Sequence, residues 1–287
     1  MTLVIDNLPF LRKVIDSWKG LRIGLVPTMG NLHEGHLQLI RKAKAESDRL
    51  VVSLFVNPLQ FGPSEDYAAY PRTFEEDYQK LLEEGTDLLF APSVDKLYPL
   101  GQINITQVSV PGLSDILCGE RRPGHFTGVA TIVTILFHLI QPKVAFFGEK
   151  DFQQLTILRR LIRDLHFPIE IVACPTVREL DGLAMSSRNR YLSPEERARA
   201  PMLYLTLCKI RLLWSEGQDQ LELLEEFGQK NLLECSFKPE YCAIRTAEDL
   251  SFPKKGHPLV VLAAAKLGRT RLIDNLLLPR QNLGFSK

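Results

Sequence analysis

Two histidines three residues apart follow an apolar segment in the stretch VPTMGNLHEGH at residues 26–36. Residues 22–28 predict a buried strand, and Gly30 separates it from a helix that begins near His33. The first turn of a helix has amide N–H groups without intrahelical partners and a positive dipole end, so it favours an anion. His33 and His36, at i and i+3, can both donate hydrogen bonds to one phosphate. The motif predicts stabilisation of the charge that develops when a phosphoanhydride breaks.

The plain alternative for this motif is a pair of surface histidines near a turn, which the preceding buried strand disfavours. Gly35 has no side chain, so a base or a phosphate can approach its backbone closely. A zinc site is also disfavoured, because HEGH is shorter than the HExxH motif, whose histidines lie at i and i+4 on one helical face.

A second polar group follows the next predicted buried strand, LVVSLFVN at residues 50–57. Asn57, Pro58 and Gln60 come just past its carboxyl end, where open parallel sheets bind ligands. Gln60 offers a donor and an acceptor to a hydroxyl or carboxylate group. Taken alone Gln60 is more often a turn residue, but beside the histidine motif we favour the ligand-binding interpretation.

A third group lies in FFGEKDFQQL at residues 146–155, again a strand, a glycine and a helix. Gly148 ends the strand, Lys150 is a point charge suited to phosphate, and Asp151 can accept from ribose hydroxyls. Gln154 lies one helical turn later and can share their pocket. The alternative is a solvated Lys/Asp pair that opens an amphipathic helix.

A fourth group, LAMSSRNRYLSP at residues 183–194, places Ser186, Ser187 and Arg188 in a loop. Arg188 can bind phosphate bidentately while the two hydroxyls donate to phosphate oxygens. A polar linker is the alternative. Because the loop lies where the sequence pattern changes, we expect a mobile lid that brings positive charge onto a triphosphate.

Two further charged stretches leave alternatives open. RRPGHFTGV contains Arg121, Arg122 and His125, and either arginine could reach a phosphate or carboxylate or be solvated. The acidic run at 75–77 could touch a magnesium ion, although a solvated first turn of a helix is the better interpretation.

These groups follow alternating strand and helix patterns through the first 175 or so residues. Strands are expected at 22–28, 50–57, 87–92, 103–110, 143–148 and 169–177, and helices at 36–47, 73–85, 128–140 and 150–165. This order predicts an α/β fold with a doubly wound, mostly parallel sheet, whose ligands bind at the carboxyl ends of the strands.

The pattern changes after about residue 178, so we expect domains at 1–178 and 179–287. A helix over 193–214 begins with a capping box, because Ser193 precedes Pro194 and Glu196 follows three residues after the serine. A second helix at 220–234 and strands at 240–246, 258–265 and 270–278 complete a smaller α+β domain.

Composition excludes several classes of protein. The chain has 287 residues, and 35 basic against 34 acidic residues leave a net charge of +1, which does not suggest a nucleic-acid-binding surface. The N-terminus lacks the uninterrupted apolar core of a signal peptide. The longest apolar stretch, 129–140, is about twelve residues against the roughly twenty that span a bilayer, so we expect no membrane partner. Five scattered cysteines without a CxxC pair indicate reduced thiols in a cytoplasmic protein.

Six collinear motifs, roughly between residues 20 and 200, closely resemble the pantothenate synthetase family, the pantoate to β-alanine ligases. They are PTMGNLHEGH, FVNPLQF, YPRT, RPGHFTGV, FFGEKDFQQL and MSSRNRYLSPEER. The resemblance implies an HxGH nucleotidyltransferase related to class I aminoacyl-tRNA synthetases, with a Rossmann-like domain followed by a smaller one. It also implies ATP and Mg²⁺ as requirements and a homodimer as the assembly.

The same resemblance implies roles for individual residues. His36 matches the catalytic histidine, with His33 as its phosphate-binding neighbour, and we expect Lys150 and Arg188 to act with them in catalysis. Gln60 and Gln154 match pantoate-binding glutamines, Gln60 also borders the β-alanine site, and Asp77 matches a position associated with magnesium. The residues matched to ATP binding are Met29, Gly30, Asn31, Leu32, His33, Glu34, Gly35, His36, Gly148, Glu149, Lys150, Asp151, Val177, Met185, Ser186, Ser187 and Arg188. The loop MSSRN takes the place of the KMSKS lid of the synthetases but carries arginine where they have lysine.

The implied reaction joins pantoate to β-alanine and yields pantothenate, AMP and pyrophosphate through a pantoyl adenylate. We expect the tips of His33, His36, Lys150 and Arg188 to converge on one polyphosphate. Three rivals remain: an HxGH nucleotidyltransferase that keeps AMP in its product, a tRNA synthetase, and a nucleotide-binding regulator without turnover. The net charge argues against the synthetase, and the number of charge-stabilising groups argues against the regulator.

Overall fold

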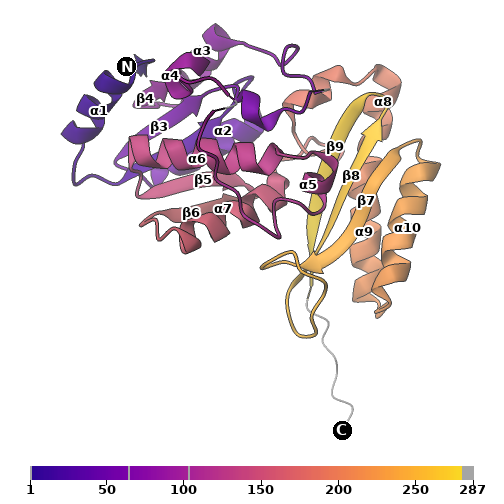
Figure 1. The fold of residues 1–287 in the computed structure, drawn as a ribbon. Helices are drawn as coiled ribbons and strands as arrows, with labels where there is room; N and C mark the ends of the chain where they lie inside the picture. The colour runs from indigo at the N-terminus through magenta and orange to yellow at the C-terminus, as the bar shows by residue number, and fades with distance from the viewer. Residues whose placement is uncertain (1, 64, 103, 280–287) are drawn as a thin grey trace. The chain divides into compact units, whose positions relative to one another are not determined.

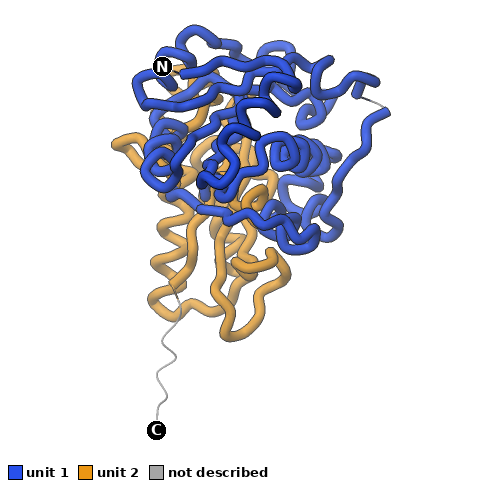
Figure 2. The backbone as a smooth tube through the Cα atoms, turned by 90° about the vertical axis from the view of Figure 1, so that its left-hand side faces the viewer, with its two compact units in different colours: residues 1–149, 157–175 blue, residues 150–156, 176–287 orange. Residues whose placement is uncertain are grey.

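The computed structural model describes residues 2–63, 65–102 and 104–279. The chain forms two compact units, the first made of residues 1–149 and 157–175 and the second of residues 150–156 and 176–287 (Figure 2). The sequence suggested one boundary after residue 178. In the structure the short segment 150–156, which contains Lys150, instead groups with the later residues.

The first unit is built on a six-stranded sheet in which every neighbouring pair of strands is parallel (Figure 1). Its order is β1 (Leu3–Ile5), β4 (Leu88–Phe90), β3 (Arg49–Leu54), β2 (Ile23–Thr28), β5 (Val144–Gly148) and β6 (Glu170–Cys174). From β2 the chain continues to β3 on one side, whereas β5 pairs with the other side of β2. The strand order therefore reverses between β2 and β5, and ligands of open α/β sheets bind at such a switch point.

Helices cover both faces of this sheet. α2 (Glu34–Ala45) and α3 (Phe74–Glu83) bury Ile40 and Leu81 against Val26, Leu50 and Phe146 on one face. α6 (His125–Ile140) lies on the opposite face in Figure 1, and α1 (Leu8–Ser17) packs against it. The remaining helices are α4 (Val94–Leu97), α5 (Cys118–Arg121), α7 (Phe152–Asp164) and the 3₁₀ helices η1 (Pro58–Gln60) and η2 (Glu149–Asp151). Strands covered on both faces read as continuous apolar runs, which is why the sequence revealed them.

The second unit is a three-stranded antiparallel sheet covered by helices. The strands β7 (Lys238–Thr246), β8 (Leu259–Leu267) and β9 (Thr270–Leu278) pair in chain order. α9 (Met202–Ser215) packs on β8 and β9, and α10 (Leu221–Glu234) packs on β7. Ile210, Leu224, Ile244, Val261 and Leu272 lie in the core they enclose. The prediction of a parallel α/β sheet followed by a smaller α+β domain is confirmed.

Two predicted elements differ from the structure. The single helix expected over 193–214 is broken into α8 (Pro194–Arg199) and α9, because Pro201 lacks an N–H and its ring clashes with the preceding helical turn. The capping box at Ser193 is confirmed. The strand expected over 103–110 is wrong for residues 104–110, and Ile103 lies outside the described residues. There the Val108 N–H donates to Thr131 Oγ1 on α6 at 2.9 Å, rather than to a neighbouring strand.

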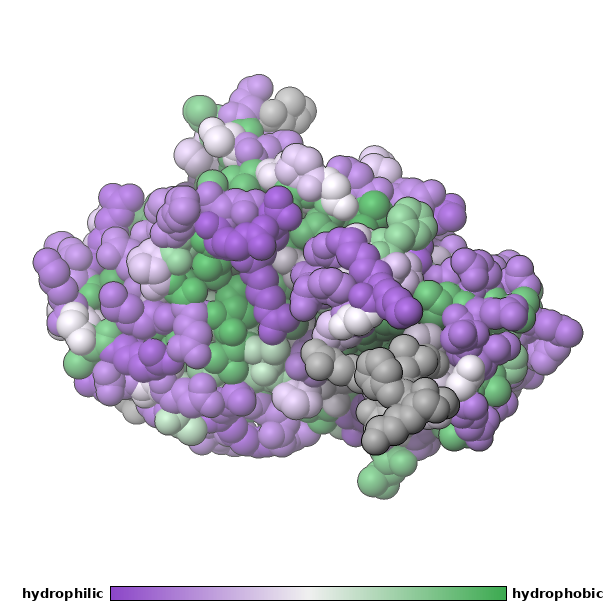
Figure 3. All heavy atoms as spheres, turned by 90° about the horizontal axis from the view of Figure 1, so that it is seen from below, coloured by the Kyte–Doolittle hydropathy of each residue, from purple (hydrophilic) through white to green (hydrophobic). Residues whose placement is uncertain are grey.

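The surface is mainly polar where it can be seen from below. Figure 3 shows this face, on which polar side chains predominate and smaller apolar areas lie between them. Among the helices of the described residues, none has the length and apolar character needed to cross a membrane.

Candidate active site

The two histidines of the opening motif cap the N-terminus of α2. His33 is the N-cap residue, and its Nδ1 accepts a hydrogen bond from the Gly35 N–H at 3.1 Å. His36 Nδ1 accepts from the His33 N–H at 3.3 Å, which closes a reciprocal capping box. The His36 N–H donates to the His33 carbonyl at 2.8 Å. The amides of residues 33, 35 and 36, which the sequence predicted to be unpaired, thus have partners, because the two imidazoles and the His33 carbonyl accept from them.

The caps determine how the two rings can interact with a ligand. Because Nδ1 of each ring accepts a backbone N–H, a neutral imidazole carries its proton on Nε2. The ring centroids of His33 and His36 lie 4.1 Å apart, so the two Nε2 donors belong to one small region. This region follows the carboxyl end of β2, at the switch point of the sheet. The geometry suits donation to neighbouring oxygens of one phosphate chain.

Asp77 of α3 fixes the loop that presents the histidines. Gly30 (φ +83°) and Asn31 (φ +52°) are both left-handed, so successive amides turn toward one point. The Asn31 N–H donates to Asp77 Oδ2 at 2.8 Å and the Leu32 N–H to Oδ1 at 2.7 Å. The hydroxyl of Thr73 donates to Oδ2 as well, at 3.1 Å. The anion held by the backbone amides of this loop is thus the protein's own carboxylate.

These contacts overturn the expected surroundings of Asp77. The acidic run was interpreted as a solvated first turn, but the Asp77 side chain is completely buried. Its two oxygens accept three hydrogen bonds from within the first unit, so it does not fit a direct magnesium ligand. Within residues 2–63, 65–102 and 104–279, His, Cys, Asp and Glu side chains form no group of three that could hold a metal ion.

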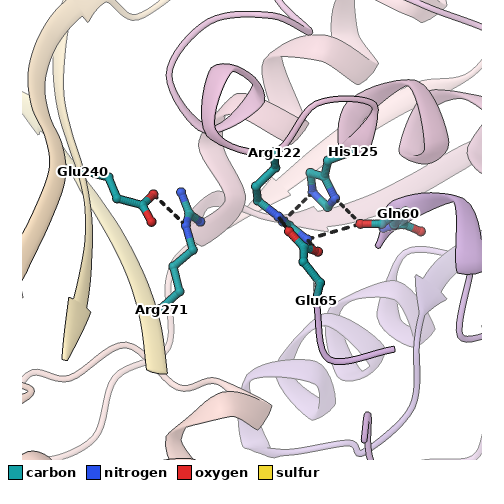
Figure 4. A network of polar contacts seen from close by, with 6 residues as sticks. All are labelled: Gln60, Glu65, Arg122, His125, Glu240 and Arg271. Atoms are coloured by element: carbon teal, nitrogen blue, oxygen red, sulfur yellow. Dashed lines mark hydrogen bonds and ion pairs between the residues drawn. The ribbon is translucent and has the colours of Figure 1, made fainter. Parts of the chain in front are cut away.

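Gln60 closes η1 just beyond β3, and its backbone carbonyl is the centre of a charged network (Figure 4). His125 Nδ1 lies 2.8 Å from the Gln60 oxygen, and an Arg122 amino group donates to the same oxygen at 3.2 Å. Arg122 also forms two hydrogen bonds with Glu65, at 2.6 and 2.7 Å. The alternative that both arginines are solvated is wrong, because Arg122 is enclosed in this network, whereas half of the Arg121 side chain is exposed.

The same network changes the acidity of Glu65. Burial on its own raises the pKa of this carboxyl, but the hydrogen bonds and positive charge of Arg122 outweigh burial and hold the pKa below its usual value of 4.5. Glu65 is therefore ionised at neutral pH and anchors Arg122, which in turn holds the backbone at Gln60.

The third predicted group begins at the carboxyl end of β5. Gly148 is the last residue of β5, and Lys150 lies within η2. The Lys150 ammonium is 3.9 Å from the Asp151 carboxylate, too long for a hydrogen bond. Within the second unit, Asn275 Nδ2 of β9 donates to the Lys150 carbonyl at 3.0 Å. Gln154 follows in the first turn of α7. The backbone that carries Lys150 is thus tied to β9.

The fourth predicted group is an ordered turn. The Met185 N–H donates to the Val177 carbonyl at 2.9 Å, so two residues predicted to bind ATP are brought together within the second unit. Ser186 caps the 3₁₀ helix η3 (Ser187–Tyr191), and its hydroxyl accepts from the Arg188 N–H at 3.3 Å. Arg188 therefore lies on a short helix rather than on an irregular linker.

A buried ion pair supports the base of this turn. Arg178 donates two hydrogen bonds to Asp274 of β9, at 2.6 and 2.9 Å, and a third to the Gly182 carbonyl at 3.1 Å. Its guanidinium carbon lies 3.7 Å from the centre of the Tyr204 ring, a cation–π contact. Figure 4 also shows the ion pair of Arg271 with Glu240, which links β9 to β7. Neither Arg178 nor Asp274 was singled out in the sequence, because nothing local marks a contact between residues so far apart.

Comparison with known proteins gives one consistent result. Residues 3–277 match the family model described as pantoate-beta-alanine ligase. A pantothenate synthetase from Nitrosococcus oceani is 52% identical over 276 residues, covering 95% of this chain and 96% of that protein. One from Chromohalobacter salexigens is 55% identical over 256 residues, covering 89% of this chain and 90% of that protein.

Solved structures show the same relationship. The crystal structure of a pantothenate synthetase from Thermus thermophilus is 46% identical and superposes with a TM-score of 0.87, covering 96% of this chain and 99% of that one. A pantoate-beta-alanine ligase from Francisella tularensis, complexed with beta-gamma ATP and beta-alanine, is 34% identical with a TM-score of 0.80, covering 96% and 98%. Sequence, fold and the order of the motifs agree over nearly the whole chain, and the chain belongs to the pantoate-beta-alanine ligase family.

Proposed function

We propose that this ligase joins pantoate to β-alanine in two steps, with ATP as the activating substrate and the His33–His36 motif at the first step. Membership of the family supports the overall reaction. The Francisella tularensis ligase is complexed with beta-gamma ATP and beta-alanine, which supports ATP and β-alanine as substrates of this chain. The observation that carries the mechanism is the pair of imidazoles at the switch point, each with Nδ1 accepting a backbone N–H, so that its donor is Nε2.

In the first step a carboxylate oxygen of pantoate attacks the α-phosphorus of ATP. A new P–O bond forms, the bond from the α-phosphorus to the bridging oxygen breaks, and pyrophosphate leaves. In the second step the β-alanine amine attacks the activated carbonyl, loses a proton as the amide forms, and displaces AMP. Splitting the reaction in this way replaces one difficult substitution with two easier ones.

The protein's part in the first step is to neutralise the charge that grows on pyrophosphate. We assign this role to His33 and His36 through Nε2, together with the ammonium of Lys150 and the guanidinium of Arg188. Each such preorganised donor is typically worth about 3 kcal/mol of transition-state stabilisation, roughly a hundredfold in rate. The remaining contacts to ATP are assigned to Met29, Gly30, Asn31, Leu32, Glu34, Gly35, Gly148, Glu149, Asp151, Val177, Met185, Ser186 and Ser187.

The two substrates of the ligation are assigned to glutamines. Gln60 and Gln154 are proposed to hydrogen-bond pantoate, and Gln60 also to border β-alanine. The network of Arg122, Glu65 and His125 around the Gln60 carbonyl supports this assignment, because it holds the backbone of that residue in place. We assign water exclusion around the adenylate to the 183–190 turn together with the turn at Gln60.

The metal ion, the oligomeric state and the cellular location are also part of the proposal. Mg²⁺ is proposed to accompany ATP on its phosphates, since Asp77 is already occupied by backbone donors. A homodimer in the cytoplasm is proposed on the family resemblance. The five cysteines, none of which forms a disulfide within the described part of the chain, are consistent with a reducing compartment.

An omission assay tests the reaction. We expect AMP to accumulate only when ATP, pantoate and β-alanine are all present, and pyrophosphate to form from ATP and pantoate without β-alanine. Pantoate labelled with ¹⁸O in its carboxylate should transfer one labelled oxygen to AMP. ADP as the product, or label in inorganic phosphate, would refute the adenylate. AMP retained in the product would instead indicate a nucleotidyltransferase.

A further inference from the structure

We infer that Tyr98 is a positioning residue that fixes Gln60 as a hydrogen-bond donor to pantoate. The inference rests on the proposed function, because it concerns the same glutamine. It concerns a second set of contacts at Gln60, those of the side-chain amide rather than those of the backbone carbonyl.

A buried relay of three side chains ends at the Gln60 amide. The Tyr98 hydroxyl lies 2.8 Å from Asn57 Oδ1, and Asn57 Nδ2 lies 2.9 Å from Gln60 Oε1. Exposure is 2% for Tyr98, 0% for Asn57 and 9% for Gln60, so water does not compete for these bonds. All three residues belong to the first unit.

The direction of each hydrogen bond follows from the backbone around Asn57. The Leu59 N–H points at Asn57 Oδ1 at 3.3 Å, so that atom must be the acceptor end of the amide. The Gly128 carbonyl lies 3.1 Å from Asn57 Nδ2, so that atom must be the donor end. Since a backbone N–H can only donate and a carbonyl can only accept, the Asn57 amide cannot be reversed.

The polarity of the Asn57 amide determines its two neighbours: its oxygen requires Tyr98 to donate, and its NH₂ group requires an oxygen on Gln60. The backbone sets this polarity, and the bond from the Tyr98 hydroxyl, at 2.8 Å shorter than the 3.3 Å contact with the Leu59 N–H, holds the amide in position. Burial raises the pKa of Tyr98, which keeps its hydroxyl protonated and able to donate. The ring of Phe55 packs edge-on against Tyr98 with centroids 5.8 Å apart and holds the hydroxyl in place.

The relay determines which end of the Gln60 amide is presented to the substrate. Oε1 of Gln60 faces Asn57, so its Nε2 end, with two N–H groups, faces away from the relay. A hydroxyl or carboxylate oxygen of pantoate is the matching acceptor. An isolated glutamine could present either end, whereas the relay selects the donor end before substrate arrives and so reduces the ordering cost of binding.

The test is the kinetics of Tyr98→Phe, which removes only the hydroxyl. We expect KM for pantoate to rise about fivefold, the scale of one buried hydrogen bond, with KM for ATP unchanged. Tyr78→Phe is the matched control, because Tyr78 lies on α3 and outside the relay; its KM values should equal those of wild type. If Tyr98 had only a structural role, Tyr98→Phe would lower the fraction of active molecules and hence the apparent kcat. It would not change KM for pantoate selectively.

A double-mutant cycle separates the relay from a general effect. Gln60→Ala removes the end of the relay, so the double variant with Tyr98→Phe should have the same KM for pantoate as Gln60→Ala alone. Independent multiplication of the two effects would overturn the inference, as would a wild-type KM in Tyr98→Phe. If Tyr98→Phe does not fold, Asn57→Asp replaces the next donor of the relay, Asn57 Nδ2, by an oxygen, and a wild-type KM for pantoate in that variant overturns the inference equally.

A substrate-free measurement distinguishes this inference from the proposed function. The side-chain amide resonance of Gln60, identified by its loss in Gln60→Ala, should shift in Tyr98→Phe and stay unchanged in Tyr78→Phe. An unchanged resonance in Tyr98→Phe overturns the relay. Absence of pantoate-dependent AMP formation by the wild-type chain overturns the proposed function instead, and the resonance still decides whether Tyr98 acts on Gln60.

Discussion

Gly128 on α6 is the point where that helix touches η1, and its replacement by alanine should displace Gln60. A Cβ at residue 128 would lie 2.2 Å from the Leu59 carbonyl oxygen and 2.9 Å from the Gln60 nitrogen. Carbon and oxygen normally approach to about 3.3 Å, so relief requires a movement of about 1 Å. Since both atoms that the added Cβ would meet belong to the backbone, no side-chain rotation removes the clash.

The effect on stability follows from two opposing contributions. Overpacking costs about 1–3 kcal/mol of unfolding free energy, and alanine in a helix returns about 1 kcal/mol relative to glycine. Gly128→Ala should therefore lower the unfolding free energy by only about 1 kcal/mol. A misplacement of about 1 Å at a substrate-positioning residue costs about a hundredfold in rate, so kcat/KM for pantoate should fall by that factor.

The assay compares initial rates at varied pantoate with urea unfolding of the same preparations. Gly62→Ala is the control, because a Cβ at Gly62 would meet only the Glu65 side chain, with Cγ at 3.7 Å and Cδ at 3.9 Å, which are ordinary contact distances. That variant should keep its kcat/KM for pantoate within a few-fold of wild type. If Gly128→Ala matches wild type in both measurements, the tight contact between α6 and η1 does not hold Gln60 and the reasoning fails.

Three further predictions concern stability, each measured by denaturant unfolding. Asp77→Asn turns an amide NH₂ toward a backbone N–H and should lower the unfolding free energy by about 1–3 kcal/mol. Glu76→Gln, at the exposed neighbouring residue, should change the unfolding free energy little. Equal effects of the two substitutions would contradict the structural role of Asp77. Glu65→Gln should be less stable than wild type at pH 7 by about 1 kcal/mol. Because the pKa of Glu65 is lowered in the folded protein, its contribution to stability is complete above the ordinary value of 4.5 and is lost as the pH falls through the lower folded value. The unfolding free energies of wild type and Glu65→Gln should therefore converge in acid. A difference between them that stays constant with pH would be inconsistent with this prediction. Arg178→Met leaves the buried Asp274 carboxylate unpaired and should cost about 3 kcal/mol, part of which Asp274→Asn in the same chain recovers; no recovery would argue against a charge effect.

The sheet could be predicted from the sequence because its strands are short apolar runs separated by helical patterns. β1 and α1 were not predicted. The break in the 193–214 helix was overlooked although Pro201 marks it, since the apolar periodicity continues across the proline. Residues 104–110 alternate like a strand, yet Val108 bonds to a side chain of α6, a contact that depends on the packed fold.

At the site, the spacing of His33 and His36 correctly indicated two imidazoles on one turn. It did not reveal that their Nδ1 atoms cap the helix, because this depends on ring orientation rather than on spacing. Asp77 was interpreted as solvent-facing, since burial of one carboxylate in an acidic run has no local signal. Tyr98 was missed altogether, because its partner Asn57 is distant in the chain and only the fold brings the two together.

The central claim is that the imidazole of His36 donates to the phosphates of ATP in the first step. His36→Gln tests it, because glutamine three residues after the N-cap can keep the capping contact while the imidazole is lost. Exchange of labelled pyrophosphate into ATP, dependent on pantoate and without β-alanine, should fall about a hundredfold in this variant while its unfolding curve stays near that of wild type. Exchange at the wild-type rate by a folded His36→Gln variant would contradict the claim.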